Sequence, residues 1–331
     1  SPIPNPHEII LIKNCLLNII LKMEDFKNKY EMINENMDKN ISLIKNKKNN
    51  NYCILKKIFI KSQEEMNKTE NEANILKNLN HKNIVKYYES FKNNNQFYII
   101  MEYCSKKDLR NFIKEYKNNN KFIQQSIIKS IILDICSGLK EIHENNIIHR
   151  DLKPENIFKS EDNIYKIGDF GISKKLEGTK HAKTGGIGTD CYMAPELFQG
   201  QKYDNKVDIW ALGCIIYELF SLEQCFGSND SIIAVINKII SSEHGKIDLN
   251  KYSSDWQDLI DSLLQSDPKN RPNIKEIYDK VKELKDNKTT TDNMFRNCNN
   301  LKTIYLKSNK NFNMLKSQLE KDNINAQIII K

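Results

Sequence analysis

The sequence lacks the patterns of a zinc-binding, disulfide-rich or membrane-spanning protein. Its eight cysteines form no CxxC pair and have no histidine at zinc-ligand spacing, so we expect free thiols in a reducing compartment, many of them buried. The apolar run at residues 9–21 contains Lys13 and Asn14 and is too short to span a bilayer. It also lacks the flanking features of a signal peptide. We therefore expect a cytoplasmic or nuclear protein with no membrane partner.

The sequence also lacks a compact arginine-rich stripe. Its formal net charge of +8 comes mostly from lysines scattered beside asparagines, as in residues 45–51 (KNKKNNN). Non-specific binding to nucleic acid requires clustered cations, so solvated loops explain this excess better, and we expect no nucleic acid partner. A nucleic-acid-binding module stays an alternative, which a salt-dependent DNA or RNA shift assay would test.

The remaining composition is that of an ordinary globular protein. Of 331 residues, 39% are hydrophobic and 28% are charged, which excludes wholesale disorder and allows one large or two small domains. Strand-like runs fill residues 30–60, 84–91 and 96–103, with one helical pattern at 63–79 between them. Short β-type runs follow at 147–149, 156–158 and 164–167. Helical patterns dominate the chain beyond residue 107, and the short β-type runs lie between them. The helical patterns cover residues 107–117, 124–145, 205–222, 231–242, 255–265 and 273–285, and an amphipathic helix could also form around Phe312 and Leu319.

One stretch carries groups that suit phosphoryl transfer. Residues 149–156 read HRDLKPEN, and Asp169-Phe170-Gly171 begins thirteen residues beyond Asn156. The reaction needs a carboxylate near the attacking hydroxyl, oxygen ligands for Mg²⁺ and cations near the phosphates. Asp151, Lys153, Asn156 and Asp169 supply these groups.

With Ala194-Pro195-Glu196 in the same order and spacing, these motifs resemble those of eukaryotic protein kinases, over about residues 30–284. The resemblance implies an α+β, bilobal fold, with a small five-stranded β-sheet lobe carrying one main helix and a larger, mainly α-helical lobe. The small lobe would cover about residues 30–103 and the large lobe about 104–284. Residues 1–29 and 285–331 would be terminal extensions, through which a regulatory partner could bind. ATP and Mg²⁺ would be the cofactors, and a protein with Ser or Thr acceptors the substrate.

The resemblance assigns the catalytic and metal-binding roles by position. Asp151 would orient the substrate hydroxyl and accept its proton, and Lys153 would contact the γ-phosphate. Asn156 and Asp169 would bind Mg²⁺. The lysine two residues after Asp151, and Thr189 in GTDCYMAPE, match the serine/threonine type.

The nucleotide-binding residues follow in the same way. Lys56 occupies the lysine position of the Ala-x-Lys strand, and Glu72, nine residues before His81, would pair with it. Met101 would be the gatekeeper before the hinge, where the backbone of Glu102 and Cys104 would bind adenine.

Four other residues match structural positions of the family. Glu196 and Arg271 would form a buried ion pair, and Asp208 would hold the backbone of the HRD motif. His149 would stack with Phe170 in the core and not act as a base.

The phosphate-covering loop departs from the family pattern G-x-G-x-x-G-x-V. Counting back from Lys56 places the valine at Ile41 and the three glycines at Asn34, Asn36 and Lys39, so that no glycine is left. Asparagine is the best substitute where a left-handed backbone is needed. Ile54, where alanine is usual, should narrow the adenine pocket. An active kinase with weaker ATP binding is favoured, and a pseudokinase that acts as a scaffold or allosteric partner is the alternative.

Within the family, the sequence is most similar to the NIMA-related kinases. MEYC at the hinge, YDNKVDIWALG at 203–213 and DPKNRP at 267–272 carry this similarity. The initiation-factor-2 kinases, which share NIF and KIGDFG, are the rival group. Thr184 is the candidate activating phosphosite, where a phosphate would meet Arg150, and Thr179 is a second candidate.

Overall fold

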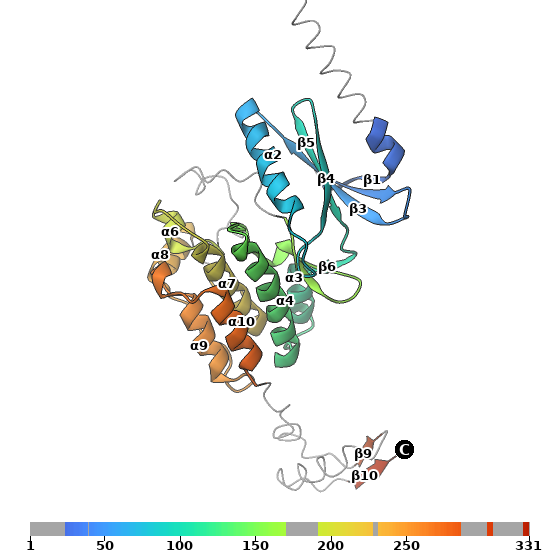
Figure 1. Ribbon diagram of the computed structural model, residues 1–331. Helices are drawn as coiled ribbons and strands as arrows, with labels where there is room; N and C mark the ends of the chain where they lie inside the picture. Colours follow the sequence, from blue (N-terminus) through green and yellow to red (C-terminus); the bar gives the residue numbers. More distant parts are fainter. Residues whose placement is uncertain are drawn as a thin grey trace, which may run out of the picture.

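The small lobe is a five-stranded antiparallel sheet in the order β1-β2-β3-β5-β4 (Figure 1). In the computed structural model the described residues are 24–38, 40–169, 191–227, 231–285, 303–306 and 327–330. The strands are β1 (Tyr30–Asp38), β2 (Ile41–Asn46), β3 (Tyr52–Phe59), β4 (Tyr87–Asn93) and β5 (Gln96–Glu102). The predicted five-stranded sheet is confirmed.

Both faces of this sheet are covered. Alternate residues of a strand point to opposite faces, so Phe97 and Ile99 of β5 pack under helix α2 (Gln63–Lys77), together with Met66 and Ala73 of that helix. The other face is closed by a second cluster, whose members are Phe26, Tyr30, Ile44, Cys53, Leu55, Tyr98 and Ile100. Phe26 comes from a helical turn at residues 24–29, so this part of the predicted N-terminal extension packs on the sheet.

The large lobe is helical (Figure 1). Its helices are α3 (Leu109–Asn118), α4 (Gln125–Glu144), α6 (Pro195–Phe198), α7 (Lys206–Ser221), α8 (Ile232–Ser241), α9 (Ser254–Leu263) and α10 (Ile274–Glu283). Nearly every residue of α7 is buried, so it forms the centre of the lobe, with α4 and α9 packed against it. Side-chain caps mark several helix starts, because the first backbone N–H groups of a helix lack partners. Asp108 caps α3, and Asn273 forms a capping box with Glu276 on α10.

A small three-stranded sheet lies where the lobes meet (Figure 1). It contains β6 (Lys106–Asp108), β7 (Ile157–Lys159) and β8 (Tyr165–Ile167), and the short 3₁₀ helix η1 (Pro154–Asn156) precedes β7. A parallel bridge between Ile84 and Ile167 continues the contact into the small lobe. The loop that carries residues 149–153 therefore lies between α4 and this small sheet, next to the contact with the small lobe.

The sequence-based assignment needs two corrections at this junction. Residues 147–149 were expected to form a strand, but they have no regular structure, because the backbone of His149 bonds to the Asp208 side chain and not to a neighbouring strand. Strand β6 was not expected, since three polar residues (KKD) give no strand signal. The helix expected around Phe312 lies outside the described residues.

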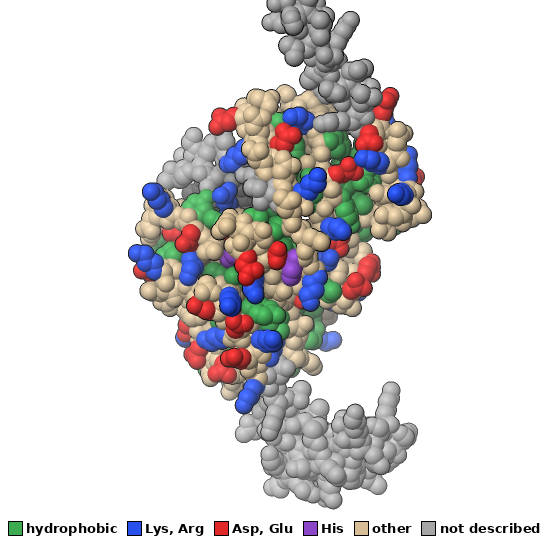
Figure 2. All heavy atoms as spheres, viewed as in Figure 1, with side chains coloured by type: hydrophobic (Ala, Val, Ile, Leu, Met, Phe, Trp, Pro, Cys, Tyr) green, Lys and Arg blue, Asp and Glu red, His purple; other side chains and the backbone are tan. Residues whose placement is uncertain are grey.

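The cysteines agree with expectation. The six cysteines in the described part of the chain are thiols that form no disulfide bond, and four of them are buried: Cys53, Cys136, Cys191 and Cys214. Within the described ranges, no helix combines the length and the apolar character needed to cross a membrane. On the face shown in Figure 2, lysines and arginines alternate with acidic residues over both lobes. Two short strands, β9 (Thr303–Leu306) and β10 (Gln327–Ile330), pair in parallel near the C-terminus.

Candidate active site

Asp151, Lys153 and Asn156 lie together on the loop between α4 and β7. The Lys153 ammonium is 3.1 Å from Asp151 Oδ2. Asn156 Nδ2 donates to the backbone oxygen of Asp151 at 2.7 Å and to its Oδ2 at 3.1 Å. Asn156 is buried, so it fixes the orientation of the Asp151 carboxylate. The structure thus brings together the three predicted catalytic side chains.

Asp208 of α7 binds the backbone of this loop. Its two carboxylate oxygens accept the N–H groups of His149 and Arg150, each at 2.9 Å. The second of these residues, Arg150, has φ of +68°, an unfavourable conformation that needs such support. The predicted role of Asp208 is confirmed. The same carboxylate also lies 2.8 Å from the buried Nε2 of His143, a partner that the sequence did not reveal.

His149 is a neutral, buried residue of the core. Its Nδ1 faces the N–H of Asp151 at 3.3 Å, so it must be the unprotonated acceptor. Its Nε2 therefore carries the proton and donates to the Gly168 oxygen at 3.0 Å. Burial lowers the pKa of His149, despite the nearby Asp208. These contacts support the predicted core role, although its predicted stacking partner Phe170 lies outside the described residues.

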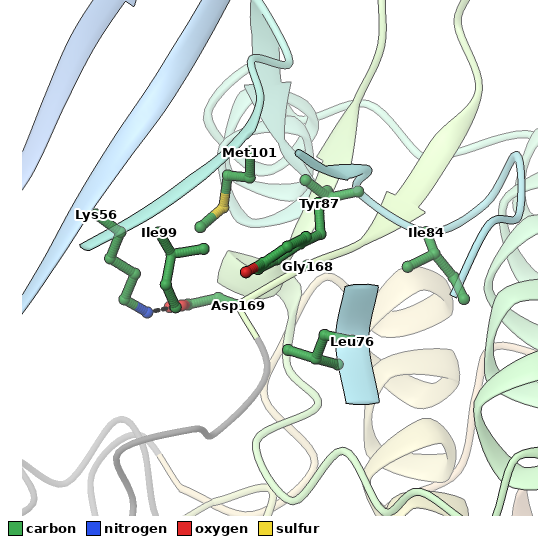
Figure 3. A pocket seen from close by; sticks show the side chains of 9 residues that line it. Lys56, Leu76, Ile84, Tyr87, Ile99, Met101, Gly168 and Asp169 are labelled. Carbon is green, nitrogen blue, oxygen red and sulfur yellow. Dashed lines mark hydrogen bonds and ion pairs between the residues drawn. The ribbon is translucent and has the colours of Figure 1, made fainter. Parts of the chain in front are cut away.

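Asp169 and Lys56 form an ion pair across the gap between the lobes (Figure 3). Asp169 has φ of +54°, a left-handed conformation at the end of the tightly packed β8 segment. The preceding Gly168 leaves no room for a side chain, because an added Cβ would lie 2.7 Å from Val85. Glu72, the other predicted partner of Lys56, lies in α2, but its side chain is outside the described part, so that pair stays a prediction.

A small cavity of about 30 Å³ lies behind this ion pair. Figure 3 shows Met101 at its wall and the Tyr87 ring pointing into it, with Leu76 of α2 on the other side. Its volume accommodates one water molecule and not a nucleotide base. An adenine ring would therefore lie in front of Met101, toward the hinge.

The hinge offers free backbone groups where adenine is expected. Cys104 lies beyond the end of β5, and its N–H forms no hydrogen bond with any described residue. Burial raises the pKa of its thiol to about 12, so the thiol is neutral. The Glu102 side chain points elsewhere, to the Lys166 ammonium at 2.8 Å and the Lys86 N–H at 3.0 Å. The N–H of Glu102 donates to the Lys86 oxygen at 2.8 Å, so a nucleotide could use only the backbone oxygen of Glu102.

The residues present fit ATP and Mg²⁺. Because Asn156 Nδ2 is bonded to Asp151, its Oδ1 is left as a ligand, and it accepts no hydrogen bond from a described residue. Asp169 supplies a carboxylate. Among the described residues no group of three or more His, Cys, Asp or Glu could hold a metal by itself. Mg²⁺ commonly uses one or two protein oxygens together with phosphate oxygens, which is the arrangement available here.

The phosphate-covering loop differs from expectation. Asn34 lies in β1 opposite Leu43, and its φ is not positive. Asn34 therefore does not use a left-handed backbone. The β1–β2 pairing is instead irregular around it, with one register shift before Asn34 and one after it. Ile41 pairs with Lys56, and Ile54 pairs with Met101, so both aliphatic residues lie next to residues that are predicted to bind the nucleotide.

Several predicted residues cannot be placed. Phe170, Thr179, Thr184, Thr189 and Lys39 lie outside the described residues, as does the side chain of Asn36.

A buried ion pair stabilises the large lobe as predicted. The two terminal nitrogens of the Arg271 guanidinium donate to Glu196, at 2.8 and 2.9 Å, and both side chains are almost fully buried. Arg271 also donates to the backbone oxygens of Gln265 and Lys206. Removing either charge would leave the other unpaired, at a cost of about 3–5 kcal/mol.

One charged network was missed by the sequence analysis. Arg110 of α3 bonds to Glu155, two residues beyond Lys153, and to Glu218 of α7. It also contacts the Tyr192 hydroxyl, which donates to Glu218. The only signal in the sequence was Arg110 itself, at the start of a helical pattern, and nothing in its spacing indicated these partners.

Comparisons with known proteins agree with the geometry. The family model described as "Protein kinase domain" matches residues 39–281. The chain is 40% identical over 243 residues to "Probable serine/threonine-protein kinase nek3" of Dictyostelium discoideum. It is 35% identical over 240 residues to "Serine/threonine-protein kinase Nek1" of Mus musculus, and 37% over 258 residues to "Probable serine/threonine-protein kinase nek2" of Dictyostelium discoideum.

The matches cover most of this chain but only part of the relatives. They include 72%, 72% and 74% of the chain, and 22%, 20% and 61% of the three relatives in the same order. The predicted similarity to the NIMA-related kinases is confirmed.

Proposed function

Because this chain belongs to the protein kinase family, we propose that it transfers the γ-phosphoryl group of ATP to serine and threonine hydroxyls of protein substrates. One observation carries the proposal most directly: Asp151, Lys153 and Asn156 contact one another, while Asp169 reaches Lys56 from the opposite side. The serine/threonine-kinase names of its relatives support the acceptor type.

The catalytic side chains act on the acceptor hydroxyl. Bound ATP with Mg²⁺ supplies the phosphoryl group and neutralises part of its charge. Asp151 orients the hydroxyl and accepts its proton, and Asn156 holds the carboxylate in place. Lys153, 3.1 Å from Asp151, provides a cation next to the transferred group. Asn156 Oδ1 and Asp169 are the metal ligands of the proposal.

The nucleotide is held mainly from the small lobe. Lys56 binds the α- and β-phosphates, and Glu72 pairs with Lys56 in the active state. Met101 borders the adenine, which bonds to the backbone of Glu102 and Cys104. Asn34 and Ile41 cover the phosphates without the usual glycines, so we expect ATP binding to be weaker than with a glycine-rich loop.

The test is transfer of labelled γ-phosphate to a generic Ser/Thr protein, with Asp169→Ala as the control. We expect labelling by the wild type and a loss of at least about a hundredfold in the variant, because an oxygen ligand for Mg²⁺ and the partner of Lys56 are removed. Equal background labelling by both proteins would refute the proposal. Thermal stabilisation by ATP, with and without Mg²⁺, then distinguishes a protein that cannot bind ATP from one that binds it but transfers the phosphoryl group slowly.

A pseudokinase scaffold is the alternative that this assay addresses. It is suggested by the missing glycines at Asn34, Asn36 and Lys39. The retained Lys56, Asp151, Asn156 and Asp169 and the names of the relatives favour an active enzyme.

Regulation and organisation are part of the same proposal. The kinase domain spans residues 30–284, and residues 1–29 and 285–331 bind regulatory partners. Phosphorylation of Thr184, or of Thr179, orders the activation segment through Arg150, whose exposed side chain pairs with no described residue. The protein acts in the cytoplasm or nucleus.

A further inference from the structure

A second cavity, of about 580 Å³, opens beside the catalytic loop. Lys153 and Asn156 form one wall, and α3 and the end of α7 form the others. Because Lys153 and Asn156 both contact Asp151, a peptide that presents its hydroxyl to Asp151 can place a neighbouring side chain in this cavity. We propose that this cavity is a substrate subsite, which binds an acidic or phosphorylated side chain near the acceptor residue. This inference rests on the proposed kinase function.

Two of the three carboxylates that line the cavity, Glu155 and Glu218, are bonded to Arg110, and the third, Glu223, pairs with Lys117. Arg110 bonds to Glu155 at 2.8 Å and also to Glu218. The remaining oxygen of Glu218 accepts from the Tyr192 hydroxyl. The second oxygen of Glu155 has no partner among the described residues, but it is buried and out of reach of a ligand. A basic side chain of a substrate would therefore find no accessible free carboxylate at Glu155 or Glu218.

The accessible cations of the cavity lie on one face of α3. Lys114 and Lys117 are three residues apart, so they are neighbours on the helix surface. Lys114 is exposed and forms no ion pair with any described residue. Lys117 is 2.6 Å from Glu223, but both side chains are about half exposed, so this pair is weak and an incoming anion can compete for Lys117.

This arrangement sets the expected selectivity. A carboxylate at the rim gains up to two exposed ion pairs, which corresponds to a preference of about three- to tenfold over alanine. A phosphoserine carries more charge and should gain more than glutamate. A lysine meets repulsion from Lys114 and should fall below alanine. Because the cations are exposed, the preference should shrink at high salt.

The test uses peptides with one acceptor serine and with Glu, phosphoserine, Lys or Ala at each neighbouring position in turn. We expect the wild type to show the highest kcat/KM for Glu or phosphoserine at one or two positions. Lys114→Glu should remove this preference. Lys121→Glu, the same charge change at an exposed lysine outside the cavity, should keep the wild-type ratio of Glu to Ala peptides.

Binding of fluorescently labelled peptides provides a readout that does not need turnover. If no peptide and no generic protein is phosphorylated, the proposed function fails, while tighter binding of the Glu peptide than of the Lys peptide would still support the subsite. Equal treatment of Glu, Ala and Lys peptides by the wild type, or an unchanged ratio in Lys114→Glu, would overturn the inference. A gain with phosphoserine but not with glutamate identifies a phosphorylated substrate as the ligand.

Discussion

Asp208→Asn tests whether the catalytic loop depends on a single buried carboxylate. Asp208 is 1% exposed and receives three donors: the N–H groups of His149 and Arg150, and Nε2 of His143. The substitution keeps the size of the side chain but replaces one oxygen with an NH₂ group. One donor must then face another donor.

The cost follows from these contacts. Oδ2 serves two donors and Oδ1 serves one, so the remaining amide oxygen should stay with His149 and His143. The Arg150 N–H then loses its acceptor. A hydrogen bond to a charged group contributes about 1.5–3 kcal/mol, and a buried unpaired donor costs about 1–3 kcal/mol. These two contributions partly describe the same loss, so they do not add in full. We expect Asp208→Asn to destabilise the large lobe by about 3 kcal/mol.

The assay can observe this lobe separately. The sequence contains two tryptophans, Trp210 and Trp256, and both are fully buried in the large lobe. Their fluorescence during denaturant unfolding reports on that lobe even if the lobes unfold in separate steps. Asp258→Asn, an exposed position on α9, is the matched control and should change stability by less than about 0.5 kcal/mol. A loss below about 1 kcal/mol in Asp208→Asn would refute the reasoning, because it would show that Arg150 needs no support from this carboxylate.

Two further predictions concern the same site. Burial lowers the pKa of His149 below its usual 6.5, so the unfolded chain takes up the proton first and stability falls as pH decreases below 6.5, by up to about 1.4 kcal/mol per pH unit. His149→Gln should be less stable than the wild type at neutral pH. Its free energy of unfolding should change less between pH 6.5 and 5 in the same fluorescence assay, and a pH dependence equal to that of the wild type would show that another group is responsible. In the phosphate-covering loop, replacing Asn34, Asn36 and Lys39 by glycine should lower the KM for ATP by about tenfold, which is 1.4 kcal/mol of binding. Steady-state kinetics at varied ATP measure this, and a KM equal to that of the wild type would mean that the lost glycines do not limit binding.

Elements with a strong hydrophobic period could be predicted from the sequence. The helices α4, α7 and α10 begin and end within one or two residues of the expected ranges. In α4 and α10 the apolar residues recur every three to four positions, whereas α7 is a long and nearly continuous apolar segment. The catalytic motif identified Asp151, Asn156 and Asp169 because phosphoryl transfer needs these residue types close together. Both results depend on local patterns.

Features that depend on contacts between distant residues could not be predicted. Arg110 meets Glu155 and Glu218, which are 45 and 108 residues away, and no spacing rule indicates such a meeting. Strand β6 forms only because the hinge places Lys106 beside Lys159. The pairing of Lys56 with Asp169 likewise requires two lobes to meet, and the sequence alone gave no way to rank it against the expected Glu72 pair.

The missing glycines of the phosphate-covering loop fit a pattern that extends over the whole chain. The protein has only 11 glycines in 331 residues. Asparagine occupies left-handed turn positions where glycine is usual, at Asn50, Asn94, Asn120, Asn146 and Asn163. Five of the six described glycines remain where an added Cβ would come within 3 Å of another atom, as at Gly138 against the Asn83 oxygen.

Glycine is therefore retained mainly where a side chain cannot fit, and it is replaced where asparagine can adopt the same backbone. Neither Asn34 nor Asn36 is among these left-handed positions, so the missing glycines of the loop match the scarcity of glycine in the chain and not the left-handed exchange. A domain that had lost its catalytic role would be expected to change the acidic and basic groups of the site, yet Lys56, Asp151, Lys153 and Asp169 are all kept and in contact as pairs. If the triple glycine variant lowers the KM for ATP while kcat stays constant, the loop affects nucleotide binding and not the chemical step.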